Sequence, residues 1–66
     1  MGVLKVIEVL SSSKESWEDA TRNAVSEAAK SVKNIRSVYV KEHSCVVDDN
    51  KLTRFRVNVK ITFEVN

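Results

Sequence analysis

The side chains best suited to chemistry lie in the second half of the chain. His43 and Cys45 are two positions apart, so on a β-strand both side chains lie on one face. A structural zinc site needs four ligands, and this chain has one histidine and one cysteine. These two residues and the scattered serines show no triad spacing for nucleophilic catalysis. We expect no enzymatic activity, and no metal site unless symmetric copies of the chain add ligands.

A second group of polar side chains follows directly, at Asp48, Asp49 and Asn50. Their oxygens are ligands that calcium prefers, but a calcium loop has more oxygens, a glycine at the bend and a distal glutamate. The same residue types are common turn formers. The segment 48–51 is therefore predicted to be a hairpin turn.

Basic side chains recur at Arg54, Arg56 and Lys60, and a guanidinium is a fork that suits carboxylate or phosphate. The net charge is only +2, with eleven basic and nine acidic residues. That balance favours neither a nucleic-acid partner nor a membrane surface. Residues 1–10 are too short and too charged for a signal segment or a spanning helix, so we expect a cytoplasmic protein.

Three segments have the pattern of β-strands, over residues 3–10, 35–47 and 52–65. The third alternates apolar and polar side chains without a miss over its last twelve residues. The apolar positions are Phe55, Val57, Val59, Ile61, Phe63 and Val65. The first has apolar residues on both faces, which indicates a strand that is covered at least in part on both.

A helix is predicted over residues 17–33. Ser16 suits the N-cap, and Asp19 is placed to reach back to it in a capping box. Apolar residues recur at helical spacing from Trp17 to Val32, and Trp17 is expected to pack in the core. Asn34 suits a left-handed residue that terminates the helix.

The element order is therefore β-α-β-β, a single α+β domain over residues 1–66. The simplest arrangement is a three-stranded sheet of antiparallel type, in order 1-3-2, packed on one helix. At about 3.3 Å per residue the third strand spans more than 40 Å, beyond what a helix over 17–33 covers at about 1.5 Å per residue. A second chain is expected to cover the remaining apolar surface, which predicts an oligomer.

The turn also predicts a register for the second and third strands. If Val47 opposes Leu52, the following pairs are Cys45–Arg54, His43–Arg56, Lys41–Asn58 and Tyr39–Lys60. All these residues would lie on the face away from the helix. A β-bulge near residues 44–47 would shift the pairing by one.

From residue 3 to residue 66 the chain resembles the dodecins. The resemblance depends on the order and spacing of four segments: Lys5-Val6-Ile7, Ser16-Trp17-Glu18, Asn34-Ile35-Arg36 and Val57 to Phe63. It implies a β-α-β-β protomer in a hollow homododecamer of cubic symmetry, which binds and stores small ligands without catalysis. In that family, flavin rings stack between tryptophans of neighbouring protomers, and a glutamine on the last strand holds the polar edge of the ring.

The resemblance also assigns the family's site positions to this chain. Ser37 stands at the stacking tryptophan and Arg56 at the glutamine, while Glu42 and His43 stand at the family's acid–glutamine pair. The ligands implied are flavins such as FMN, FAD or riboflavin, or calcium in the subgroup that lacks the tryptophan and carries the arginine. Since stacking contributes roughly 0.5–1.5 kcal/mol per aromatic pair, we expect the usual flavin sandwich to be lost.

Two alternatives to that expectation stay open. One is a flavin-binding dodecin in which Ser37 and Arg56 have remodelled the pocket. The other is a non-catalytic interaction module whose basic strand face, Arg54, Arg56 and Lys60, binds an acidic partner. High salt would weaken such a partner contact but leave a shell held by apolar burial intact.

Overall fold

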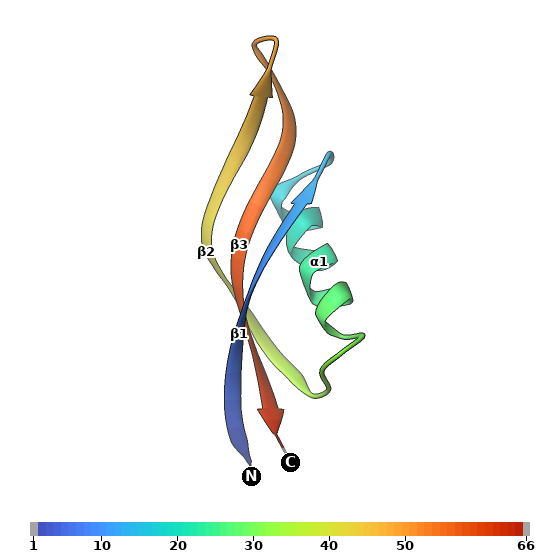
Figure 1. Ribbon diagram of the computed structural model, residues 1–66, viewed down its shortest axis with the longest axis vertical. Coiled ribbons are helices and arrows are strands. Elements are labelled where there is room, and N and C mark those ends of the chain that lie inside the picture. The colour runs from blue at the N-terminus through green and yellow to red at the C-terminus, as the bar shows by residue number, and fades with distance from the viewer. Residues whose placement is uncertain (1, 66) are drawn as a thin grey trace.

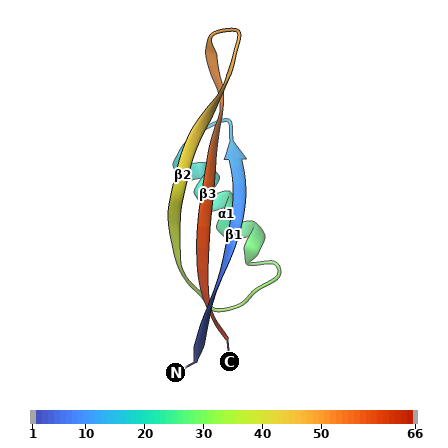
Figure 2. The same cartoon turned by 60° about the vertical axis from the view of Figure 1, so that its left-hand side comes forward.

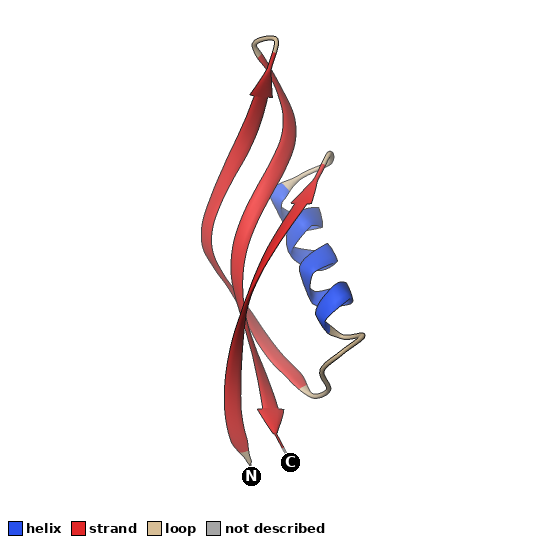
Figure 3. Ribbon diagram, in the orientation of Figure 1, coloured by secondary structure: helices blue, strands red, loops and turns tan. Residues whose placement is uncertain are grey.

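The computed structural model describes residues 2–65. Along the chain they form β1 (Val3–Ser13), α1 (Trp17–Ala28), β2 (Ile35–Asp48) and β3 (Lys51–Val65), as Figure 1 shows. The strands make one antiparallel sheet in the order β1-β3-β2. The helix lies on one face of it (Figures 2 and 3). The predicted β-α-β-β fold and strand order are confirmed.

The core lies between β3 and α1. Val57, Val59 and Ile61 of β3 are at most 3% exposed and pack with Ala20 and Ala24 of the helix. The alternation in β3 points every second side chain at the helix, and small helix residues allow the two elements to approach closely. Only these five apolar side chains are fully buried among the described residues, so the core is small.

The helix is shorter than the sequence predicted. It ends at Ala28, where the periodicity had indicated residue 33. The backbone tightens there, because the amide of Lys30 donates to Glu27 and that of Ser31 donates to Ala28, three residues back. Asn34 does have a left-handed backbone conformation (φ 64°), but it directly precedes β2 and does not end the helix.

The first strand is longer than predicted, ending at Ser13 instead of Leu10, because the serines continue to pair with β3. The hydroxyl of Ser13 donates to Asp19 Oδ2 at 2.6 Å and accepts the Glu15 amide at 2.8 Å. Ser16 caps the helix as predicted, accepting from the Asp19 amide at 2.9 Å. The Asp19 carboxylate binds Ser13, so the reciprocal half of the predicted capping box is wrong.

The hairpin between β2 and β3 turns at Asp49 and Asn50, as predicted. Both have positive φ, 53° and 62°, and Asp48 pairs with Lys51 across the turn. Two successive left-handed residues make a type I′ turn, whose twist matches that of the flanking strands. The predicted pairing of Val47 with Leu52 follows from this two-residue loop and is confirmed.

Beyond the turn, the predicted register of β2 against β3 is wrong over its middle. An irregularity between Val46 and Val47 shifts the pairing by one, and another between Val40 and Glu42 shifts it back. The observed pairs are Val46–Arg54, Cys45–Phe55, Ser44–Arg56, His43–Val57, Glu42–Asn58 and Tyr39–Lys60. Only the last of the four pairs predicted beyond Val47–Leu52 is therefore confirmed.

The molecule is elongated, with extents of 50 × 19 × 13 Å. Its radius of gyration is 13.4 Å, where a compact chain of this length has about 11 Å. Its accessible surface is 4956 Å², against about 4,200 Å² for a typical monomer of 7.5 kDa. A 12-residue helix is only about 18 Å long, so within residues 2–65 much of the sheet is not covered by the helix.

Candidate functional site

The face of the sheet that α1 does not cover, called here the open face, carries the polar residues of interest. On β3 it presents Arg56, Asn58 and Lys60, which alternate with the buried core positions. Apolar side chains lie among them: Leu10 is 77% exposed and Tyr39 66%. A surface that mixes large exposed apolar groups with charges has the composition of a binding surface.

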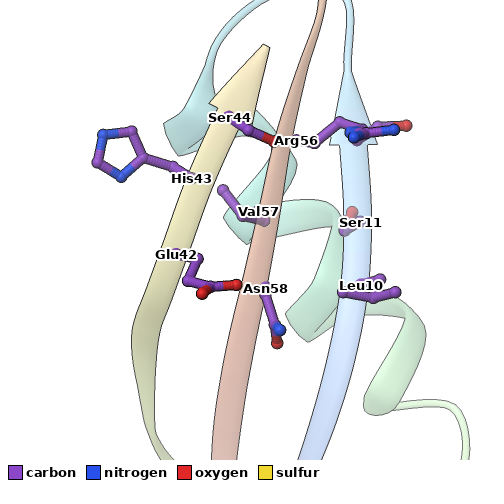
Figure 4. A pocket seen from close by; sticks show the side chains of 9 residues that line it. Leu10, Ser11, Glu42, His43, Ser44, Arg56, Val57 and Asn58 are labelled. Carbon is purple, nitrogen blue, oxygen red and sulfur yellow. The ribbon is translucent and has the colours of Figure 1, made fainter. Parts of the chain in front are cut away.

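A hollow of about 760 Å³ lies on this face where all three strands run together (Figure 4). Two rows of residues that oppose one another across the strands form it, Leu10–Asn58–Glu42 and Ser12–Arg56–Ser44. Its full lining is Leu10, Ser11, Ser12, Glu42, His43, Ser44, Arg56, Val57 and Asn58. The volume is in the range of small-ligand pockets.

Among the described residues, Arg56 is the one cationic side chain that lines the hollow. It is exposed, and within residues 2–65 it has no ion pair, whereas Arg22 binds Glu18 at 3.0 Å and Arg36 binds Glu64 at 2.8 Å. Figure 4 shows its guanidinium extending across the end of β1. The five N–H donors of Arg56 are therefore available to a ligand.

Acidic and amide groups make up the neighbouring part of the open face. Figure 4 shows the Glu42 side chain directed toward Asn58, whose Oδ1 is buried without a hydrogen-bond partner. Lys41, the extra residue at the bulge of β2, places its Nζ 3.5 Å from Glu8 Oε2. A hydrogen bond from Asn58, followed by the charge of Lys41, holds the pKa of the Glu8 carboxyl below its ordinary value.

His43 does not lie where the predicted register placed it. It opposes Val57, and the imidazole is directed away from Arg56 (Figure 4). Its ring packs edge-on against Trp17 with 4.8 Å between centroids. Trp17 also packs on Phe55 at 5.3 Å and donates from its indole nitrogen to the Ser44 carbonyl at 3.0 Å.

The prediction that Trp17 packs in the core is therefore wrong: 38% of its surface stays exposed, and its ring packs on His43 and Phe55, outside the core cluster. The bulge between Val46 and Val47 explains the position of His43, because a one-residue shift moves a side chain to the opposite face of the sheet. Ser44 takes the place opposite Arg56 that the sequence had assigned to His43.

Ser37 lies on the open face but far from the hollow. It opposes Thr62, which is six residues from Arg56 along β3, or about 20 Å in an antiparallel strand. Glu42 and Arg56 both line the hollow, whereas Ser37 does not. Within one protomer the structure therefore brings together two of the four predicted positions on one face, with His43 at the rim and Ser37 remote.

Among the polar residues of the two rows, Ser12, Ser44 and Asn58 were not predicted as site residues. Asn58 carried a usable signal, because it alternates in phase with Arg56 along β3. Ser12 lies in a serine-rich segment whose composition predicts a loop. Ser44 opposes Arg56 only because the bulge shifts the register of β2.

The hollow of a single protomer does not suit a stacked flavin. The only aromatic ring among its lining residues is the imidazole of His43, which is directed away from Arg56. The hollow also does not suit calcium by itself. Calcium takes six to eight oxygens, and here one carboxylate, Glu42, and one amide, Asn58, stand beside a guanidinium.

Residues 2–65 contain no group of three or more His, Cys, Asp or Glu side chains placed to hold a metal ion. The helix within that range is too short and too polar to cross a membrane.

Comparison with solved structures identifies the fold. A mutant dodecin of T. thermophilus superposes with a TM-score of 0.93 at 23% identity, covering 100% of this chain and 98% of that one. Dodecin from Streptomyces davaonensis gives 0.93 at 22% identity, covering 98% and 96%. At these identities the agreement concerns the fold alone.

Three further findings reach beyond the fold. Calcium dodecin from Mycobacterium tuberculosis is 35% identical over 65 residues, covering 98% of this chain and 92% of the relative. Its crystal structure, described as a calcium-chelating protein with a novel calcium-binding site, matches with a TM-score of 0.84, covering 97% and 91%. The sequence profile of the family described as Dodecin matches residues 3–66. The chain belongs to the dodecin family.

Proposed function

We propose that this protein assembles into a homododecameric shell that binds and stores a small ligand in the cytoplasm, without catalysing a reaction. The observation that carries the proposal is the open face. Leu4 and Val6 of β1 are 59% and 55% exposed there, beside Tyr39 of β2 at 66%. Residues 2–65 of a single protomer leave these side chains exposed, and copies of the same chain would cover them.

The energetics favour such an assembly. Burying one aliphatic side chain contributes roughly 1.5–3 kcal/mol, which is large beside the stability that a core of five residues gives a domain this small. Both β1 and β2 are edge strands of the sheet, so each also offers unpaired backbone groups to a neighbour. Self-association therefore supplies the stability that the isolated protomer lacks.

The cargo we favour is a small ligand other than a stacked flavin. Ser37 offers no ring for stacking, and the charge of Arg56 replaces the amide that the family resemblance assigns to that position. Calcium is a candidate because the relative from M. tuberculosis is described as calcium chelating. The hollow of one protomer lacks the oxygens for it, so calcium would need ligands from more than one protomer.

Two alternatives have different support. A remodelled flavin pocket is supported by the volume of the hollow, about 760 Å³. A basic face that binds an acidic partner is supported less well. Arg54, Arg56 and Lys60 do share the open face, but Glu8 opposes Lys60 and Glu42 lines the hollow with Arg56, which reduces the local net charge.

Native mass spectrometry of the purified protein tests the assembly and any retained cargo together, with light scattering after size exclusion as a second measurement. We expect a dodecamer at micromolar concentration. A monomer or dimer would contradict the shell. Calorimetric titration with calcium, with magnesium as the control, then tests calcium as cargo.

Titration of flavin fluorescence tests the loss of stacking. The natural protein should show no saturable quenching at low micromolar riboflavin, because no aromatic ring stands at position 37. The double variant Ser37→Trp with Arg56→Gln should gain quenching, since it restores both groups of the family pattern. Saturable quenching by the natural protein would favour the remodelled flavin pocket instead.

A further inference from the structure

We propose that the row Ser12–Arg56–Ser44 is an oxyanion site, which binds the phosphate or carboxylate group of a small organic ligand. The proposal refines the cargo of the proposed shell, although the row itself lies within one protomer. It assigns to Arg56 a role opposite to that of a metal ligand, because its charge repels a cation and attracts an anion.

The first argument is the geometry of the sheet. Arg56 on β3 opposes Ser12 on β1 and Ser44 on β2, so the three side chains stand in one line across the strands. Directly opposed residues of antiparallel strands have Cβ atoms about 4.5–5.5 Å apart. The Cβ atoms of Ser12 and Ser44 therefore stand on either side of that of Arg56. The guanidinium extends across the end of β1, where Ser12 lies (Figure 4), so the row offers one hydroxyl donor beside the guanidinium and a second, from Ser44, across β3.

The second argument is chemical. A guanidinium presents N–H groups in a planar fork that matches the two oxygens of a carboxylate or phosphate. A serine hydroxyl donates one further hydrogen bond. Charge-assisted hydrogen bonds of this kind are about twice as strong as neutral ones, and nothing within residues 2–65 forms an ion pair with Arg56.

The third argument concerns the nearest acid. Glu42 lines the same hollow, but its side chain is directed toward Asn58 in the adjacent row (Figure 4). No ion pair forms between Glu42 and Arg56. The positive charge therefore remains available on the side of the hollow that Ser12 and Ser44 line.

The class of ligand follows from the rest of the lining. Leu10, 77% exposed, stands in the neighbouring row and offers an apolar wall next to the anion site. A ligand that pairs an apolar body with a terminal phosphate or carboxylate matches both parts. Phenyl phosphate is the simplest probe with these features, with inorganic phosphate and phenol as its two halves.

The experiment is calorimetric titration of the assembled protein at fixed ionic strength. We expect phenyl phosphate to bind more tightly than inorganic phosphate, and phenol to bind weakest. Arg56→Gln should weaken phenyl phosphate about tenfold or more, and Ser12→Ala and Ser44→Ala should each weaken it about threefold. The matched control is Arg54→Gln. It removes an equal charge two residues from Arg56, and the Arg54 side chain does not line the hollow.

Three results would overturn the proposal. One is that the natural protein does not bind phenyl phosphate, as when a neighbour's carboxylate already occupies Arg56. The second is an equal loss in Arg54→Gln, which would show a diffuse charge effect. The third is an unchanged affinity for phenyl phosphate in Arg56→Lys, which keeps the charge but not the planar fork. This variant also tests the proposal if Arg56→Gln does not assemble.

Light scattering on the same samples separates this proposal from the proposed function. A dodecamer that does not bind phenyl phosphate would overturn the oxyanion site and leave the shell. A monomer or dimer that binds it through Arg56 would support the site and overturn the shell.

Discussion

Glu8 lies near the middle of the open face, where Asn58 and Lys41 both favour its charged form. Its pKa is lowered from 4.5 in the folded protein. A lowered carboxyl pKa gives stability that is fully present above the unfolded value and is lost as the pH falls through the folded value. Acid should therefore destabilise the protein partly through this residue, and Glu8→Gln should reduce the loss of stability between pH 6 and pH 3.

Urea unfolding at a series of pH values, at one protein concentration, measures this difference. Glu15→Gln is the control, because Glu15 is exposed and forms no ion pair with any residue of the described chain. If the Glu8→Gln and natural proteins lose stability in parallel, the Glu8 network does not contribute.

Trp17 combines ring packing with one hydrogen bond to the Ser44 carbonyl. Trp17→Phe keeps an aromatic ring against Phe55 but removes the donor, and should cost about 1 kcal/mol of unfolding free energy. Trp17→Ala also removes the packing and should cost at least about 2 kcal/mol. Circular dichroism during urea unfolding measures both, and equal losses in the two variants would show that the ring contacts contribute little.

At the residue scale, the sequence predicted the faces of Ser37 and Arg56 but not those of His43 and Glu42, which lie between the two bulges. The face of a residue on β3 follows from its regular alternation. The face of a residue on β2 depends on where the bulges are, and no residue type among residues 43–47 marks a bulge. Because two bulges cancel, Tyr39 keeps its predicted partner while everything between them is displaced.

At the scale of elements, the β2–β3 turn is the sharpest feature to test. Asn50 has φ of 62°, a conformation that costs a β-branched residue about 1–2 kcal/mol. Asn50→Val should lower the thermal midpoint, whereas Asn50→Gly should hold or raise it. Lys51→Val is the control at a strand position, and a similar loss there would show that backbone conformation is not the cause.

The elements were mostly predictable because each of the three strands carries its own apolar pattern. The errors lie at the ends of elements. Val32 fits the helical spacing, yet the backbone leaves the α-helix at Ala28. The serines after Leu10 have the composition of a loop, yet the length of β3 gives them partners. Pairing with the distant β3 decides the end of β1, and local composition does not report it.

At the scale of the whole molecule, the open face should control assembly. Val6→Glu places a charge among apolar side chains that we expect neighbours to cover, so light scattering should give a mass well below that of the dodecamer. Ser26→Glu, on the exposed side of α1, should keep the mass of the natural protein. A dodecamer of Val6→Glu would show that this part of the open face is not an interface.

The strand order β1-β3-β2 also has a consequence for synthesis on the ribosome. In the described part of the chain, β1 pairs only with β3, the last of the four elements to be made. The Val- and Ile-rich first strand must therefore wait, unpaired, while α1 and β2 emerge. An unpaired apolar strand is a site for aggregation, so translation that stalls before β3 should yield an insoluble nascent chain.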